Sequence, residues 1–200
     1  AFTRISMKIL SAAQIKNLDL KTIAHEPISS LALMERASLA FVHEFAKKYT
    51  NQALIHIFCG HGNNGGDGLA IGRILSTLSF NVQVYLIDTG NKPSLDFETN
   101  LIQLKTHLLP HRISEQTHFP KIDPEQVCID ALFGTGLSRP VEGIAAALIQ
   151  HINSSNCDIV SVDIASGLYV DQPNDPHDMI IKPTYTLTFQ VPKLSFMFPA

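Results

Sequence analysis

The stretch Ala53–Gly68, ALIHIFCGHGNNGGDG, decides the fold of this chain. Its first half is a short apolar run with β-branched and aromatic side chains, which is typical of a buried strand. Its second half is a glycine-rich turn, and a helix is predicted to follow over Leu69–Leu78. A strand, a glycine turn and a helix in this order indicate one unit of a parallel α/β sheet.

The same alternation of strands and helices continues along the chain. Further strands are expected at Val82–Ile87, Val127–Phe133, Ile159–Ile164 and Tyr185–Gln190, with helices at Leu95–Leu109 and Val141–Ile152 between them. Upstream, Ser11 can cap a short helix that runs to Ile15, and Ser29 or Ser30 can cap a longer one that ends near Tyr49. We therefore expect one Rossmann-like α/β domain, a three-layer sandwich around a mostly parallel sheet, with the two early helices packed against it.

Composition limits the class of protein. With 200 residues, of which 45% are hydrophobic and 16% charged, the chain is expected to form one ordered domain. Its 15 basic and 18 acidic side chains give a net charge of −3, which disfavours binding to nucleic acid through phosphate contacts. No apolar run approaches the roughly 20 residues of a membrane span, so no membrane association is expected. Cys59, Cys128 and Cys157 lie in or beside apolar runs, which predicts buried thiols.

The two ends of the chain carry expectations of their own. Ala1–Ser6 shows no periodicity, and we interpret it as a remnant of protein production, so that the domain occupies residues 7–200. No basic, apolar, cleavable leader is recognised, and a cytoplasmic location is expected. The chain stops soon after its last predicted strand, which favours a piece truncated at the C-terminus from a longer protein.

The glycine run is the first candidate for a binding site. Gly60–Gly68 contains the spacing G-x-G-x-x-G, in which backbone N–H groups approach a phosphate at the start of a helix. Asn63, Asn64 and Asp67 add polar side chains that could contact a ligand, and His61 could reach it too. The alternative is a structural turn, in which the asparagines adopt left-handed conformations and Asp67 caps the helix.

Two more predicted strands end in polar residues. Asp130 lies in one and is followed by Gly134–Pro140, and Asp163 lies in the other, before a turn that contains glycine. Because ligands bind outside the carboxyl ends of parallel strands, these turns and the glycine run are expected to line one crevice. The structural alternative is that each carboxylate accepts backbone N–H bonds from the turn that follows it. Oxygen atoms of Asn64, Asp130 and Ser166 could also hold a hard cation.

With these residues in view, the chain resembles the YjeF N-terminal domain family, the NAD(P)HX epimerases, over roughly Met7–Leu194. Three stretches carry the resemblance: GNNGGDG at Gly62–Gly68, DALFGTGL at Asp130–Leu137 and VDIASG at Val162–Gly167. The resemblance implies an enzyme of nicotinamide nucleotide repair, which interconverts the R and S forms of hydrated NADH or NADPH (NADHX, NADPHX). It also implies a homodimer, and a fused or separate ADP/ATP-dependent dehydratase that acts on the S form.

The resemblance further implies roles for individual residues. Substrate would be bound by Asn63, Asn64, Gly65, Gly66, Asp67, Gly134, Thr135, Gly136, Leu137, Ser138, Arg139, Pro140 and Asp163. A potassium ion would be held by Asn64, Asp130 and Ser166. Two positions depart from the family pattern: Ala165 stands where the family usually has Pro, and Ser38 where it usually has Gly. Neither departure removes a proposed ligand.

A mechanism follows as a hypothesis. The lone pair of the ring nitrogen expels the protonated hydroxyl at C6, which leaves a planar iminium, and water returns to the opposite face. This chemistry needs an acid and a base, and Asp163 and Asp67 are the predicted catalytic carboxyl groups. Asp130 is expected to serve the cation instead.

Two other functions stay open. The same fold could act as a non-catalytic scaffold or an RNA-linked binding module, although a scaffold need not keep the polar run and both strand-end carboxylates. An NAD-dependent oxidoreductase is favoured by Asp88, which ends a strand where an acidic residue would meet a ribose hydroxyl. No Tyr–Lys or His–Asp pair for hydride transfer is evident for that reading.

Overall fold

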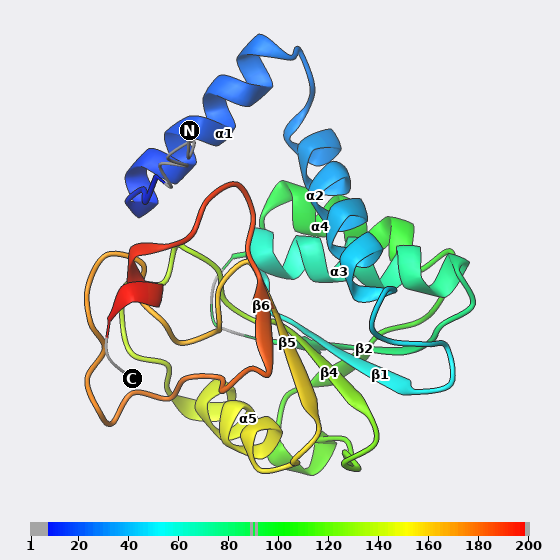
Figure 1. Cartoon of the computed structure of the whole chain (residues 1–200). Helices are drawn as coiled ribbons and strands as arrows, with labels where there is room; N and C mark the ends of the chain where they lie inside the picture. The colour runs from blue at the N-terminus through cyan, green and yellow to red at the C-terminus, as the bar shows by residue number, and fades with distance from the viewer. Residues whose placement is uncertain (1–7, 89, 91, 199–200) are drawn as a thin grey trace, which may run out of the picture.

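A single parallel sheet forms the centre of the protein (Figure 1). The structure is a computed structural model and describes residues 8–88, 90 and 92–198, so the expectation for Ala1–Ser6 lies outside the described residues. The strands are β1 (Leu54–Cys59), β2 (Asn81–Ile87), β3 (His111–Ile113), β4 (Val127–Ala131), β5 (Asp158–Val162) and β6 (Tyr185–Leu187). Their order is β3-β2-β1-β4-β5-β6, and all neighbours pair in parallel, which confirms the predicted α/β sheet.

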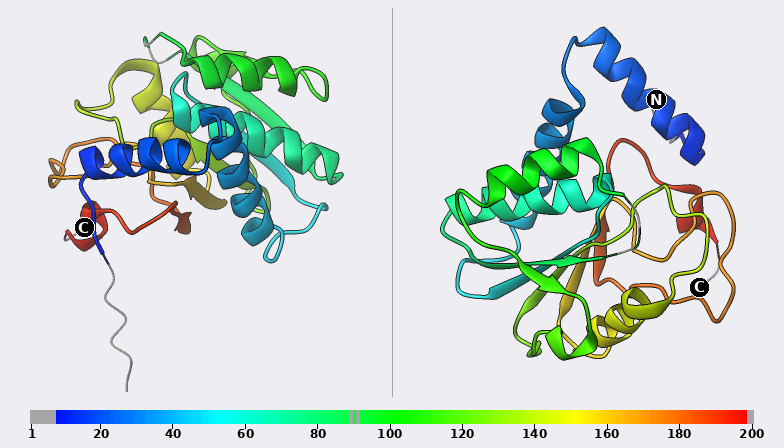
Figure 2. Two further views of the ribbon diagram at one scale, coloured as in Figure 1. Left: turned by 90° about the horizontal axis from the view of Figure 1, so that it is seen from above. Right: turned by 180° about the vertical axis from the view of Figure 1, so that it is seen from behind.

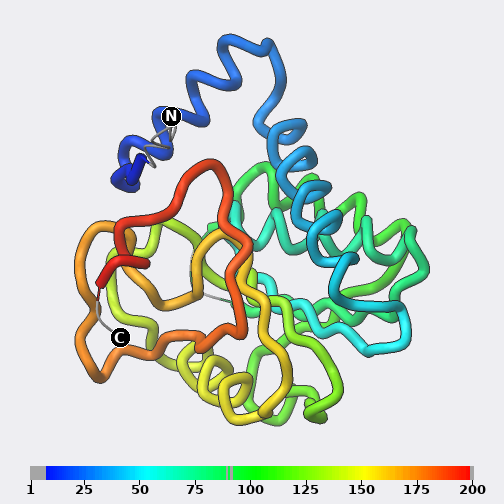
Figure 3. The backbone as a smooth tube through the Cα atoms, viewed as in Figure 1, coloured from blue at the N-terminus to red at the C-terminus, as the bar shows by residue number. Residues whose placement is uncertain are grey.

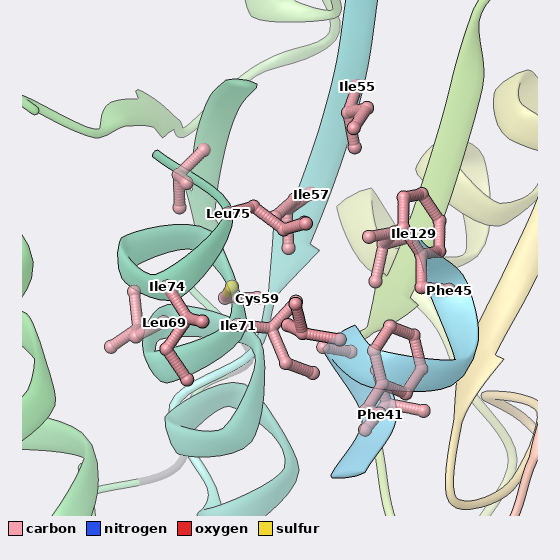
Figure 4. Close-up of a cluster of buried hydrophobic side chains, with 14 of the residues drawn as sticks. Phe41, Phe45, Ile55, Ile57, Cys59, Leu69, Ile71, Ile74, Leu75 and Ile129 are labelled. Carbon is pink, nitrogen blue, oxygen red and sulfur yellow. The ribbon is translucent and has the colours of Figure 1, made fainter. Parts of the chain in front are cut away.

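Helices cover both faces of this sheet and make the predicted three layers (Figures 1 and 2). One face carries α2 (Ser30–Phe45), α3 (Asn63–Thr77) and α4 (Leu95–Leu104), and the other carries α5 (Gly143–Asn153). Between the first group and the sheet, Phe41 and Phe45 of α2 pack with Ile71 of α3 and Ile57 of β1 (Figure 4). Because both faces are covered, the central strands are buried and largely apolar.

Helix α1 (Ala12–His25) is longer than the sequence pattern predicts. A capping box between Ser11 and Gln14 fixes its start, as expected, but it continues well past Ile15. Ile15 is its only buried residue, so the apolar stripe that would reveal a long helix is thin. The expectation that both early helices pack against the sheet holds for α2, whereas Ile15 of α1 packs against Ile164 and Val170, beyond the end of β5.

Strand β3 is a second difference, since the sequence pattern predicts only five strands. It has three residues at the edge of the sheet, of which His111 and Arg112 are exposed. A strand this short leaves no alternation to detect. Two short 3₁₀ turns complete the described elements, η1 (Gln116–His118) and η2 (Leu194–Met197).

The expectation for the cysteines is confirmed. The thiols of Cys59, Cys128 and Cys157 are buried and form no disulfide, as predicted. Within the described part of the chain, none of the helices combines the length and the apolar character that crossing a membrane requires.

Candidate functional site

A cavity of about 1010 Å³ lies at the carboxyl ends of the strands. The turns after β1, β4, β5 and β6 supply one part of its wall, and helices α1 and α2 supply another. Figure 3 shows that the turns after β4, β5 and β6 lie together at the edge of the sheet where the strands end, near α1. The predicted binding residues that line the cavity are Asn63, Asn64, Asp67, Gly134, Thr135, Gly136, Leu137, Ser138, Arg139 and Asp163. The separate polar turns therefore meet in one crevice, as predicted.

From Asn63 onward, the glycine run is helical rather than a loop. Helix α3 begins at Asn63 with Gly62 as its N-cap, well before the predicted start at Leu69. The structural alternative for this run is also wrong, because Asn63 and Asn64 have no positive φ and the N-cap is not Asp67. The polar side chains of the run thus project from the first turns of a helix.

Close packing explains why glycine occupies positions 65 and 68 of this run. A Cβ atom at Gly65 would lie 1.7 Å from the carbonyl oxygen of Gly60, and one at Gly68 would lie 2.6 Å from Cβ of Ala131. The absence of side chains lets α3 approach the backbone of β1 and the end of β4. That approach brings the first turn of α3, with Asn64, to the rim of the cavity.

Asn64 and Ser166 meet at the backbone of Phe133. Asn64 Nδ2 donates to the Phe133 carbonyl oxygen (3.0 Å), and Ser166 Oγ accepts from the Phe133 N–H (2.9 Å). Asp130 lies beneath, fully buried, and accepts from Ser166 Oγ (2.5 Å) and the Ser166 N–H (2.9 Å). Ser161 Oγ donates to the same carboxylate (2.8 Å). The three residues predicted to hold a cation therefore form one connected cluster.

Burial raises the pKa of Asp130, while the hydrogen bonds from Ser166 and Ser161 act in the opposite direction. The backbone N–H groups of Leu132 and Ser166 also donate to this carboxylate. The structural alternative for Asp130, a carboxylate held by backbone N–H bonds, is therefore correct in part. The cluster offers carboxylate, hydroxyl, side-chain amide and backbone carbonyl oxygens. This donor set fits a hard cation such as potassium.

Asp163 occupies a strained position directly after β5. Its φ is +65°, a left-handed conformation that a residue with a side chain rarely adopts, and its side chain is 14% exposed at the cavity. Three donors bind its Oδ1: Lys193 Nζ (2.7 Å), the Phe189 N–H (2.8 Å) and Thr188 Oγ1 (3.4 Å). Among the described residues none donates to Oδ2, so this oxygen is available to a ligand.

Lys193 is the residue of the site whose role sequence reasoning misses. Its side chain is completely buried and forms an ion pair with Asp163. The run Pro192-Lys193-Leu194 carries no spacing that points to Asp163.

Asp67 lies in the second turn of α3 and lines the same cavity. Burial raises its pKa well above the usual range, and the negative charge of Asp163 adds to the shift, followed by those of Asp19 and Asp96. In the described structure its carboxyl group receives no hydrogen bond from the protein, and Ser38 Oγ donates to its backbone carbonyl oxygen. The carboxyl group that faces the cavity therefore has a raised pKa, which favours its protonated form.

The remaining predicted residues lie elsewhere. Gly65 and Gly66 are buried and do not line the main cavity. Pro140 and Asp88 line a smaller cavity of about 270 Å³. His61 lies edge-on to the ring of Phe97 instead of lining the main cavity.

Known proteins resemble this chain over most of its length. Residues 30–195 match the family described as YjeF-related protein N-terminus. The chain is 34% identical to an NAD(P)H-hydrate epimerase of Limosilactobacillus fermentum, an alignment that covers 92% of this chain and 86% of that protein. It is 31% identical to a bifunctional NAD(P)H-hydrate repair enzyme Nnr of Thermofilum pendens, over 96% of this chain but only 38% of that protein.

A solved structure shows the same fold. The crystal structure of the yeast protein ynu0 aligns with a TM-score of 0.79 at 23% identity, over 94% of this chain and 82% of that one. The family match spans most of the chain, and the epimerase from Limosilactobacillus fermentum exceeds 30% identity over most of its own length. This chain therefore belongs to the family of the YjeF-related protein N-terminus.

Proposed function

We propose that this chain is an NAD(P)H-hydrate epimerase, which interconverts the R and S forms of NADHX and NADPHX at C6 of the dihydropyridine ring. Relatives that carry this name, and that match over most of their own length, support the assignment. The structural observation that carries it is that two carboxyl groups in unlike surroundings, Asp67 and Asp163, line one cavity at the strand ends.

Asp67 supplies the acid. Burial and the charge of Asp163 raise the pKa of its carboxyl group, which favours the protonated form that a general acid needs. That proton passes to the C6 hydroxyl group, which leaves as water while the lone pair of the ring nitrogen forms the planar iminium. General acid catalysis of this kind contributes about 10²–10⁴-fold to a rate.

Asp163 supplies the base. Its Oδ1 is held by Lys193 and the turn after β6, while Oδ2 receives no hydrogen bond from the described residues and serves as the proton acceptor. Water that attacks C6 from the opposite face gives its proton to this oxygen, and the other epimer forms. In the reverse direction the two carboxyl groups exchange roles.

A potassium ion belongs to the same proposal, held by Asn64, Asp130 and Ser166. When bound, its positive charge would offset the buried carboxylate and hold the turn after β4 in place. The hydrogen-bonded oxygen cluster supports this ligand set. The turn at Gly134–Arg139, which lines the cavity, would thereby be fixed for substrate.

The proposal extends to partners and location. The S epimer would be consumed by an ADP/ATP-dependent dehydratase, and the bifunctional relatives favour a partner that is fused or acts nearby. The proposal also includes a homodimer, which a measurement of mass in solution would test, and a cytoplasmic location, which cell fractionation would test.

The deciding experiment follows a single epimer of NADHX by chromatography with and without the protein. We expect the approach to the equilibrium mixture to accelerate in proportion to protein concentration. A rate equal to the spontaneous one would contradict the function and favour a scaffold. Assays of NADH oxidation against a panel of carbonyl substrates separate this function from that of an oxidoreductase, and no turnover is expected there.

A further inference from the structure

The ammonium group of Lys193 lies in the interior behind the wall of the cavity. Its side chain is 0% exposed, and Lys193 is not one of the residues that line the cavity. Nζ lies 2.7 Å from Asp163 Oδ1 and donates to the carbonyl oxygens of Phe189 (2.9 Å) and Val191 (3.3 Å). An ammonium group has three donors, and each of them has an acceptor here.

Stability alone does not explain a lysine at this position. A buried ion pair recovers little more than the cost of removing both charges from water, and well-packed apolar side chains of similar volume often replace such a pair without loss. Replacing Lys193 alone, however, would leave the Asp163 carboxylate without its counter-charge. The charge is therefore understood through the carboxylate and the two carbonyl groups that it contacts.

Those groups belong to one small assembly around Asp163. The donors to Asp163 Oδ1 other than Lys193 are Thr188 Oγ1 and the Phe189 N–H, both in the turn that follows β6. Lys193 holds the same turn through the carbonyl oxygens of Phe189 and Val191. It therefore fixes the carboxylate directly and also fixes the turn whose amide group binds it.

The arrangement leaves one oxygen of Asp163 free. All three donors converge on Oδ1, and in the described structure Oδ2 accepts no hydrogen bond from the protein. The left-handed backbone at Asp163, with φ of +65°, departs from the extended conformation of β5, which ends at Val162. A carboxylate on such a backbone needs outside contacts to keep one orientation.

We infer that Lys193 is a positioning residue, which holds Oδ1 of Asp163 in the interior and thereby aims Oδ2 at the substrate. Lys193 touches no substrate and acts only through Asp163. The inference rests on the proposed epimerase function, and it names a residue that this function does not by itself require.

The first test is the variant Lys193→Met, which keeps the chain length of the side chain and removes the charge. A misplaced catalytic group costs about 10²-fold in rate, so we expect kcat for NADHX epimerisation to fall about 100-fold while KM changes by less than about threefold. A purely structural lysine would leave kcat unchanged when the rate is expressed per folded molecule. That result would overturn the inference.

A control variant separates positioning from loss of stability. Tyr49→Phe removes the hydrogen bond from the Tyr49 hydroxyl to Asp158 Oδ2 (2.9 Å), at the amino end of β5 and outside the cavity. It should lower the melting temperature and leave kcat at the wild-type value. If Tyr49→Phe lowers kcat as much as Lys193→Met does, the effect of Lys193 is general and the inference fails.

A second variant covers the case in which Lys193→Met does not fold. Lys193→Arg keeps the positive charge but replaces a compact ammonium with a planar fork, which cannot match the same three acceptors. We expect a folded protein with reduced kcat and nearly unchanged KM, whereas wild-type kcat would contradict the positioning role.

A crystal structure of the folded Lys193 variant gives a readout without activity. We expect the Asp163 carboxylate to leave the Phe189 N–H and Oδ2 to turn from the cavity. An unmoved carboxylate would overturn the inference even if kcat fell. If the wild-type protein does not epimerise NADHX, the proposed function fails, and the crystal structure still decides whether Lys193 positions Asp163.

Discussion

Asp67 and Asp163 face one cavity, and the charge of Asp163 adds to burial in raising the pKa of Asp67. Asp163 has a buried cationic partner in Lys193, whereas the carboxyl group of Asp67 receives no donor from the described residues. Two carboxyl groups next to the same space thus have unlike electrostatic surroundings. Enzymes that need an acid and a base in one site commonly achieve it in this way.

Replacing Asp163 by Asn should separate binding from turnover. Asn keeps the size of the side chain and loses the base, so we expect kcat for NADHX epimerisation to fall by about 10²–10⁴-fold. Affinity for the nucleotide, measured by titration calorimetry, should change little. Full activity in Asp163→Asn would reject the assignment of this residue as the base.

Asp67 should make the stability of the protein depend on pH. Its folded-state pKa is raised above the ordinary value of 3.8, so its contribution to stability is fully present below that value and is lost as pH rises through the folded-state pKa. The variant Asp67→Asn has no carboxyl group to ionise at this position, so it does not lose stability in this way as pH rises. The melting temperature of Asp67→Asn relative to wild type should therefore rise from pH 4 to pH 8.

The matched control for that series is Glu98→Gln, because the Glu98 side chain is exposed, lies outside the main cavity and has no hydrogen-bond or ion-pair partner among the described residues. Its melting temperature relative to wild type should stay flat over the same range. A flat difference for Asp67→Asn as well would contradict the raised pKa of Asp67.

The glycine run should tolerate a methyl group at one position and reject it at another. Gly65→Ala puts a Cβ atom 1.7 Å from a backbone oxygen of Gly60, which cannot move aside as a side chain could. We expect a loss of at least about 1–3 kcal/mol in the free energy of unfolding, measured by denaturant titration. Gly62 has no atom within 4 Å of the corresponding position, so Gly62→Ala should fold normally.

Potassium should stabilise the protein through the cluster at Phe133. At a concentration about 100-fold above its dissociation constant, a ligand specific for the folded state adds about 2.7 kcal/mol to the free energy of unfolding. We expect the melting temperature to rise with potassium chloride but not with tetramethylammonium chloride at the same ionic strength. In Ser166→Ala the two salts should act alike, and an equal response of wild type to both salts would contradict the site.

The sequence predicts the convergence of Asn64 and Asp163 because parallel strands place their carboxyl ends at one edge of the sheet. It does not predict where α3 begins, since glycine is a poor helix former and only the contact between Gly65 and Gly60 shows why it is used in the helix.

Lys193 escapes prediction for a related reason. Lysine is rarely buried, and the partner that allows it here is far away in the sequence. Residues that are unusual for their surroundings become understandable only when the tertiary contact that compensates them is known. Such residues give this site its particular chemistry, whereas the arrangement of strands and helices is common to many α/β proteins.

Helix α1 has a consequence for how this domain is delimited. The segment that matches the family starts at Ser30, yet Ile15, Lys16 and Asp19 of α1 line the cavity, and Gln190 holds Asp19 in place. A protein trimmed to the matched segment would keep the carboxyl groups of Asp67 and Asp163 but would lose the part of the cavity wall that α1 forms. A protein made for experiments should therefore begin ahead of Ser11. Exchanging α1 between relatives offers a way to change the shape of the cavity without altering the turns at the strand ends.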